Sequence, residues 1–306
     1  MRLGNPGEAD KAFEQALAVR MRALGENHLD VARVLNNLGA VRTQLGRLDE
    51  AISAHRRALV IQERAAADGS EIYPSLRGLG MLQIHKRDFA GALESFQKAQ
   101  AIVVKRYGDN SPFLADSLHN VALALEKLNR FKEAEPVLSR SLEIRKRVLP
   151  VDHPDLAFSY HSLGRVLEAQ GKLKRALACF EEGVRIRKAA LGPGHRRTAN
   201  LVGSLGMLKV RLGDLDNGLR LLDQSFRTHV RALGPNDADT IESRKNLALA
   251  LVKAQRHEEA IPHLRELMSG DVPPGVRIDL NDALFNGMRS LRAFREMEEE
   301  VARRAH

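Results

Sequence analysis

The chain repeats itself about every 42 residues, and this period constrains its fold more than any other feature. Small residues recur at three positions of the repeat. One directly follows an apolar residue, and the other two lie further along the period. The apolar–small pairs are Leu38-Gly39, Leu79-Gly80, Val121-Ala122, Leu163-Gly164, Leu205-Gly206 and Leu247-Ala248. The further columns are Ala51, Ala92, Ala134, Ala176, Gly218 and Ala260, and Ala58, Ala99, Ser141, Gly183, Ser225 and Leu267. Small side chains let helices approach closely, so the period predicts stacked helix pairs; Leu267 is the one departure.

Each period contains two helical segments, a short turn and a longer loop. In one of them, we expect helices from about Asp155 to Ala169 and from about Lys174 to Ala190. Tyr160, Leu163 and Leu167 recur at the spacing of one helical face, which indicates a buried stripe. Gly, Pro, Asn and Asp gather in the loops, where they end one helix and begin the next.

The string SLEIRKRVLPVDHPDLAFSYHSLGRVLEAQGKLKRAL resembles the tetratricopeptide repeat, in its 42-residue kinesin-light-chain-like variety. The resemblance implies an all-α fold, a right-handed α-solenoid of antiparallel helix pairs. No heptad coiled coil precedes the repeats, so the chain is not itself expected to be a kinesin light chain. The family's usual Tyr in the first helix is replaced throughout, by Arg42, Gln83, Leu125, Leu167, Lys209 and Leu251.

We expect a single array over residues 1–306, divided into three parts. Residues 3–24 read as a half repeat with only the second helix of a pair, 27–270 as six full repeats, and 275–304 as a degenerate capping pair. The apolar face of the first helix, with Phe13, Ala16, Leu17 and Val19, needs a cover. Self-association, a partner or upstream repeats would supply it.

No catalytic or nucleotide-binding motif occurs, so we expect no enzyme, no cofactor and no metal site. His28, His153 and His195 share one repeat position and are interpreted as loop residues. The segment HEEAIPH, from His257 to His263, is not a zinc-binding HExxH sequence. Cys179 is expected to be a small buried residue.

The inner wall of such an array is lined by the first helix of each pair. Asn37, Asn120, Ser162, Ser204 and Asn246 each precede an apolar–small pair, and Gly78 takes that place once. These groups suit hydrogen bonding to an extended peptide, although bonds between neighbouring helices are an open alternative. Basic residues accompany them, and histidines would add charge below about pH 6.5. They include Arg77, His119, His161, Arg165, Arg211 and Lys245.

The sequence therefore predicts a non-catalytic scaffold or sensor module that binds an extended, acidic peptide segment in a concave groove. The alternative is a self-assembling or regulatory repeat region of a larger signalling protein. The net charge of +9 suggests nucleic-acid binding, but aromatic residues are only 4% of the chain, which disfavours it. One cysteine and the lack of a membrane-spanning apolar run favour the cytoplasm.

Overall fold

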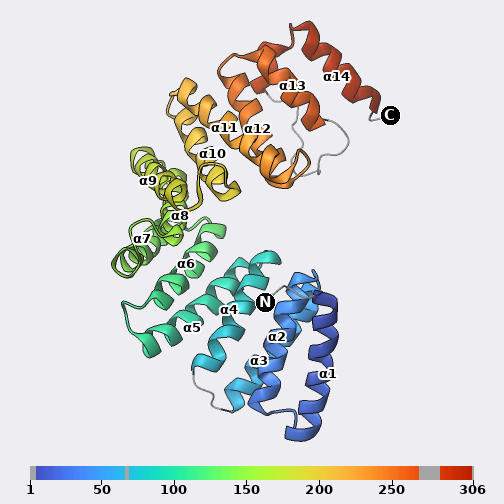
Figure 1. The fold of residues 1–306 in the computed structure, drawn as a ribbon, viewed down its shortest axis with the longest axis vertical. Coiled ribbons are helices and arrows are strands. Elements are labelled where there is room, and N and C mark those ends of the chain that lie inside the picture. Colours follow the sequence, from blue (N-terminus) through green and yellow to red (C-terminus); the bar gives the residue numbers. More distant parts are fainter. Residues whose placement is uncertain (1–4, 66–68, 269–282, 305–306) are drawn as a thin grey trace. The chain divides into compact units, whose positions relative to one another are not determined.

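A computed structural model of the chain describes residues 5–65, 69–268 and 283–304, and every regular element in these ranges is helical. The helices form two compact units, Met1–Val148 and Leu149–His306 (Figure 1). Within each unit antiparallel helix pairs stack in chain order, which confirms the predicted all-α class. The handedness of the solenoid and its division into a half repeat, six full repeats and a cap stay predictions. No helix in the described ranges is long and apolar enough to cross a membrane.

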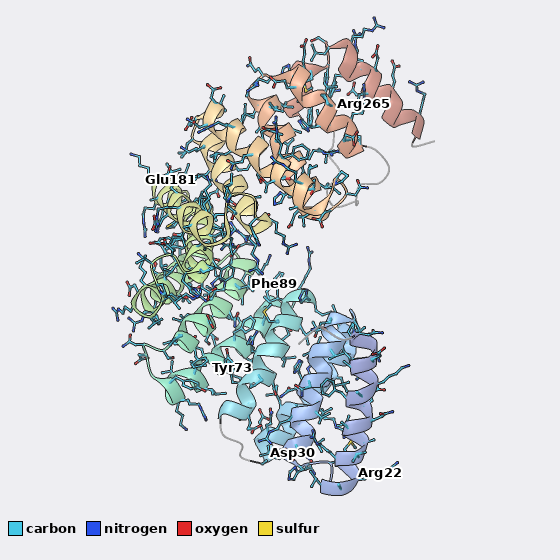
Figure 2. The ribbon with its side chains drawn as sticks, in the orientation of Figure 1. Arg22, Asp30, Tyr73, Phe89, Glu181 and Arg265 are labelled. Atoms are coloured by element: carbon cyan, nitrogen blue, oxygen red, sulfur yellow. The ribbon has the colours of Figure 1, made fainter. Side chains whose placement is uncertain are left out.

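Each repeat consists of an A helix followed by a B helix that packs against it. In the first unit the A helices are α2 (Leu29–Gln44), α4 (Gly69–His85) and α6 (Pro112–Lys127); the B helices are α1 (Pro6–Leu24), α3 (Leu48–Arg64), α5 (Phe89–Tyr107) and α7 (Phe131–Val148). In the second unit the A helices are α8 (Pro154–Ala169), α10 (Arg196–Arg211) and α12 (Ala238–Lys253); the B helices are α9 (Leu173–Leu191), α11 (Leu215–Leu233) and α13 (His257–Met268). Charged side chains such as Arg22 on α1 and Glu181 on α9 are exposed (Figure 2).

Small residues lie where the two helices of a pair touch. A Cβ atom added to Gly164 on α8 would lie 2.5 Å from the ring of Phe180 on α9, and Gly80 meets Phe96 in the same way. Ser141 and Ser225 instead donate hydrogen bonds of 2.7 and 2.8 Å to backbone carbonyls of the paired A helix. The helix axes are therefore close enough that only small side chains fit between them.

The turn between the A and B helices has one left-handed residue at a constant repeat position. Glycine supplies it at Gly46, Gly171 and Gly213, while Arg87, Asn129 and Gln255 adopt φ values of 61°, 57° and 60°. The following residue donates its N–H back to a carbonyl near the helix end, as from Asp88 to Gln83 at 2.9 Å. This geometry ends the helix and satisfies carbonyls that the helix leaves unpaired.

The loop histidines begin the A helices. The Nδ1 atoms of His28, His153 and His195 accept hydrogen bonds of 3.1, 3.2 and 3.0 Å from the backbone N–H two residues later. At the same repeat position Asp237 accepts from Asp239 N–H at 2.9 Å. Their interpretation as structural loop residues is confirmed, because an N-cap needs an acceptor with this reach.

The position of the family's usual Tyr is filled in two ways. Leu125, Leu167 and Leu251 are buried. Arg42 instead pairs with Asp10 at 3.1 Å and with Glu14 at 2.5 Å on the preceding B helix. Gln83 and Lys209 likewise bond to residues near the following turn, Asp88 and Asp214, each at 3.2 Å.

Asp10 explains how α1 docks on α2. It is 6% exposed and pairs with Arg42 and Arg47. Leu17 packs on the apolar cluster of α2 and α3, whereas Val19 remains 65% exposed. The expected cover for this helix stays a prediction.

The chain end departs from the predicted helix pair. The described part of the first expected helix, Ala283–Met288, is a 3-10 helix (η2), and its earlier residues lie outside the described ranges. The second helix is α14 (Arg292–Arg304). Phe285 and Phe294 stack with ring centroids 6.1 Å apart and extend the core of α12 and α13.

Replacing Arg87 with glycine is expected to raise the free energy of unfolding by about 0.5–1 kcal/mol. A residue with a side chain pays roughly 1–2 kcal/mol for the left-handed conformation, and glycine avoids this cost. The greater freedom of glycine in the unfolded chain offsets part of the resulting gain in stability. Gly171→Ala should lower stability by about 1 kcal/mol for the same reason. Urea denaturation of both variants checks this; equal stability of Arg87→Gly and the parent would contradict it.

His153→Ala is expected to destabilise the start of α8 by about 0.5–2 kcal/mol, because it removes the acceptor for the Asp155 amide. His153→Asp should keep most of that stability, since Asp237 caps α12 at the same repeat position. The rate of hydrogen exchange at the Asp155 amide measures directly whether the capping hydrogen bond is formed. Unchanged protection in His153→Ala would show that the bond contributes nothing.

Candidate functional site

The sequence-predicted binding residues of the first unit lie on A helices. Asn37 on α2 and Arg77 on α4 are exposed, while His119 and Asn120 on α6 are half-buried. The side chains of Asn37 and Asn120 make no hydrogen bond with any residue in the described ranges. Their role in binding stays a prediction.

In the second unit the structure brings three of the predicted residues together. Arg165 on α8, Ser204 on α10 and Asn246 on α12 line one pocket of about 350 Å³. Phe180 on α9 and Leu222 on α11 also line this pocket, together with Gly203 on α10, where an added Cβ atom would lie 3.0 Å from Ser225 Oγ. Ser162 and Lys245 are half-buried on the same A helices but do not line it.

The charge of this pocket differs from the expected positive groove. Glu168, Asp239 and Glu242 line it against the single cation Arg165. Arg211 lies 3.6 Å from Glu168 and so offsets part of that negative charge. Sequence reasoning missed Asp239, which lies in the first turn of α12 and would have been found by comparing charges at one repeat position.

Ser204 supports the structural alternative for the polar ladder at one place. Its hydroxyl lies 3.0 Å from Nε2 of His161 on the neighbouring A helix and donates to the Asn200 carbonyl at 3.2 Å. Ser204 therefore joins α8 to α10. Asn246 makes no side-chain hydrogen bond with described residues, so the ladder is not uniformly structural.

A second pocket of about 440 Å³ lies between α8, α9 and α10. Its polar lining includes Arg187 from α9 and Arg197 and Asn200 from α10, together with Asp155 and His161 from α8. Of these, only His161 was among the predicted binding residues. The two arginines form a cationic site that the sequence did not predict. In the sequence they appear only as a change of charge at the same positions of successive repeats.

The buried histidines do not add charge to the wall in mild acid, so that expectation is wrong for His119 and His161. Burial, the larger cause, and neighbouring arginines together lower the pKa of each to about 4. Burial also lowers the pKa of His55 to about 4. All three are neutral until well below the pH at which an exposed histidine becomes charged.

Two other candidate groups are His263 and Cys179. His263 packs edge-on against Phe226, with ring centroids 5.3 Å apart. Within the described ranges no three His, Cys, Asp or Glu side chains gather as a metal-binding group. Cys179 was predicted to be buried, and it is half-buried.

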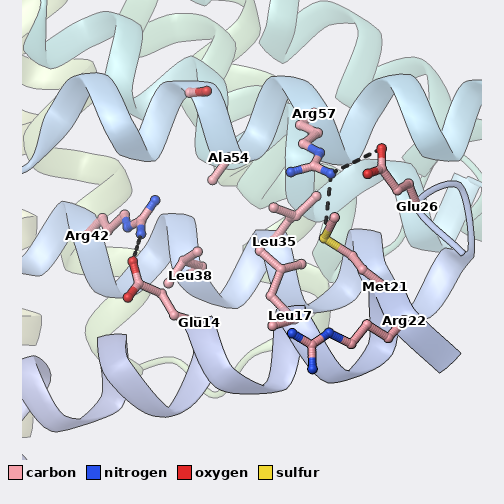
Figure 3. A pocket seen from close by; sticks show the side chains of 12 residues that line it. Glu14, Leu17, Met21, Arg22, Glu26, Leu35, Leu38, Arg42, Ala54 and Arg57 are labelled. Atoms are coloured by element: carbon pink, nitrogen blue, oxygen red, sulfur yellow. Dashed lines mark hydrogen bonds and ion pairs between the residues drawn. The ribbon is translucent and has the colours of Figure 1, made fainter. Parts of the chain in front are cut away.

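A third pocket, of about 510 Å³, lies on α1, α2 and α3 (Figure 3). Leu17, Leu35 and Leu38 form its apolar floor, and the Arg42–Glu14 ion pair lies at one end. At the other end Arg57 approaches Met21 Sδ at 3.6 Å and Glu26 at 3.8 Å. The pocket mixes apolar and charged surface beside the first helix of the described chain.

The buried histidines predict a loss of stability in acid. Unfolding returns each pKa from about 4 toward 6.5, so the unfolded chain binds more protons between these values. Stability is therefore fully present above about pH 6.5 and falls as the pH is lowered toward 4, by up to about 3 kcal/mol for each histidine. His161→Gln should flatten this slope in pH-dependent denaturation; an unchanged slope would contradict the assignment.

The tetratricopeptide repeat family matches residues 1–64, 71–147, 130–189 and 190–270. Clustered mitochondria protein homologs of Candida albicans and Brugia malayi are 23% and 24% identical over 146 and 133 residues, which are 47% and 43% of this chain. These segments are 11% and 9% of the two proteins, so the match spans about a tenth of the curated relatives' length.

Among solved structures, the apo form of RapI has a TM-score of 0.65 at 16% identity, over 87% of this chain and 94% of its own. BtubC (BKLC) from P. vanneervenii has a TM-score of 0.63 at 20% identity, over 75% of this chain and 91% of its own. The putative kinesin light chain of Podosopora anserina, with nearly identical TPR-like repeats, has a TM-score of 0.56 at 23% identity, over 63% of this chain and 91% of its own. These similarities show the fold alone. The family match and the helix pairs together establish that this chain belongs to the tetratricopeptide repeat family, with kinesin-light-chain-like proteins among its structural neighbours.

Proposed function

We propose that this chain is a non-catalytic scaffold or sensor module of the cytoplasm that binds an extended peptide along its A helices. Tetratricopeptide repeats typically bind proteins or peptides. Asn37, Asn120 and Asn246 carry the proposal, because Asn37 is exposed, the other two are only half-buried, and none makes a side-chain hydrogen bond within the described ranges. An amide has both a donor and an acceptor and can therefore pair with peptide backbone of any sequence.

The acidic preference is proposed for part of the wall only. Arg77 on α4 is exposed and makes no ion pair with described residues, and Arg187 and Arg197 line one pocket of the second unit. The adjoining pocket carries Asp239 and Glu242 and would favour a basic side chain. The preferred segment therefore contains acidic residues at particular places and is not acidic throughout.

Self-association is the second candidate, and the surface of α1 supports it. Val19 is 65% exposed, and Leu17 and Met21 line the neighbouring pocket. Light scattering as a function of concentration separates this candidate from peptide binding by a monomer. The two functions would use different surfaces, so Val19→Ser should reduce assembly without affecting peptide binding.

Asn120→Ala and Asn246→Ala are each expected to weaken binding of a peptide selected from a random library by about 2–10-fold, the value of one hydrogen bond. Fluorescence anisotropy over a salt series measures both affinity and the charge contribution. Arg165→Ala should change the affinity most at low salt and thereby change its salt dependence.

Gln97→Ala is the matched control, because Gln97 is an exposed amide on the B helix α5. It should leave affinity unchanged. Failure to select any peptide, or equal effects of Gln97→Ala and Asn120→Ala, would overturn peptide binding on the A helices.

A further inference from the structure

Arg187 is a buried cation on the B helix α9. The residue is 8% exposed, and its Nε atom has no hydrogen-bond partner in the described part of the chain. No ion pair joins its guanidinium to any residue in the described ranges. Burial lowers its pKa, and the nearby Arg197 lowers it further. A buried charge without a partner is costly, so this arrangement calls for an anion.

In the preceding repeat, an arginine at the same repeat position contacts a carboxylate. Arg145 lies 42 residues before Arg187 and is equally buried, at 5% exposed. It pairs with Asp116 on α6 at a distance of 2.5 Å. The residue that corresponds to Asp116 in the Arg187 repeat is Phe158, which is 42% exposed. The arginine has therefore been kept while its carboxylate has been lost.

The space beside Arg187 is open and positively charged. Phe158, Arg187, Arg197 and Asn200 line the pocket of about 440 Å³ between α8, α9 and α10. Its lining has two guanidinium groups and one carboxylate, Asp155. Arg197 lies in the first turn of α10, where the helix dipole also favours an anion. The Asn200 amide adds a hydrogen-bond donor.

The next repeat has the opposite charge at the same positions. Arg187 corresponds to His229, Arg197 to Asp239, and Asn200 to Glu242. These three residues line the acidic pocket of the second unit. The cationic pocket is thus a property of one repeat and not a general feature of the wall. It can therefore select the side chain at one position of the ligand.

We propose that the pocket between α8, α9 and α10 binds a carboxylate side chain of the peptide ligand, which takes the place on Arg187 that Asp116 takes on Arg145. The inference rests on the proposed peptide-binding function and adds the chemical class recognised at one position. A carboxylate matches the planar guanidinium group with two parallel hydrogen bonds. Phe158 and Leu191 provide the apolar walls for its methylene stem.

The test uses three blocked peptides of glycine and serine that differ at one central residue: glutamate, glutamine or phosphoserine. Each is titrated into the full chain while the arginine Nε–Hε signals are followed by NMR. The glutamate peptide is expected to shift the Arg187 signal and to bind about tenfold more tightly than the glutamine peptide. Tighter binding of phosphoserine, with no saturation by glutamate, would overturn the carboxylate assignment in favour of a phosphoryl group.

Arg187→Gln should remove the difference between the glutamate and glutamine peptides. Arg185→Gln is the matched control, because it removes the same charge from α9 at an exposed residue already paired with Glu182 and Asp152. Phe158→Asp is a second variant that restores the carboxylate of the preceding repeat. The new carboxylate should form an ion pair with Arg187, preserve the fold and abolish the glutamate preference. This variant tests the proposal even if Arg187→Gln fails to fold.

Equal binding of the glutamate and glutamine peptides to the parent chain, or a preference that survives Phe158→Asp, would overturn the proposal. These outcomes differ from a failure of peptide binding itself. A library-selected peptide that depends on Asn120 but ignores Arg187 would leave the proposed function standing and remove the carboxylate pocket alone.

Discussion

The close contact of the two helices in each pair is the constraint on which the structure depends. Where a B helix presents the ring of Phe96 or Phe180, the A helix has glycine, at Gly80 and Gly164. Any added methyl group would overlap the ring, so the helix axes could not keep their distance. The stacking of pairs, the surface of A helices and the pockets between them all follow from this contact.

His55 takes the place of the phenylalanine ring in the first repeat, where it shows how a polar group is accommodated at that contact. It is 4% exposed, and its ring faces both Gly39 and Gly78. Nδ1 lies 2.9 Å from Asn36, whose oxygen also accepts from Ser75 at 2.8 Å. Burial keeps the imidazole neutral and bonded instead of charged, so this histidine is part of the core and not of a binding surface.

Regular packing leaves other positions free to vary between repeats, and that variation is where function can arise. Arg145 and Arg187 occupy one repeat position, but of the two only Arg145 forms an ion pair with a carboxylate in the described ranges. One repeat further, His229 is surrounded by acidic groups. The backbone arrangement is shared while the charge of the pocket changes, so neighbouring repeats can select different side chains of the same ligand.

Much of this could be predicted because small residues at a fixed period permit only close helix packing. The buried stripe, the helix boundaries near residues 155 and 190 and the all-α class needed no coordinates. The charge of the wall was predicted less well. A count of basic residues along the A helices cannot tell that Arg211 is neutralised by Glu168, or that Arg187 reaches the wall from a B helix.

The sequence by itself determined the repeat, the paired helices and the residues that hold them together, since these depend on side-chain size at a constant spacing. Only the tertiary structure decided which polar groups are free and which are occupied. Ser204 is bonded to His161, the Asn246 side chain is bonded to no residue that the structure describes, and His119 is too buried to gain a proton in mild acid. The physical reason is that hydrogen bonding and desolvation depend on neighbours from other helices, whose distances a periodic pattern does not specify.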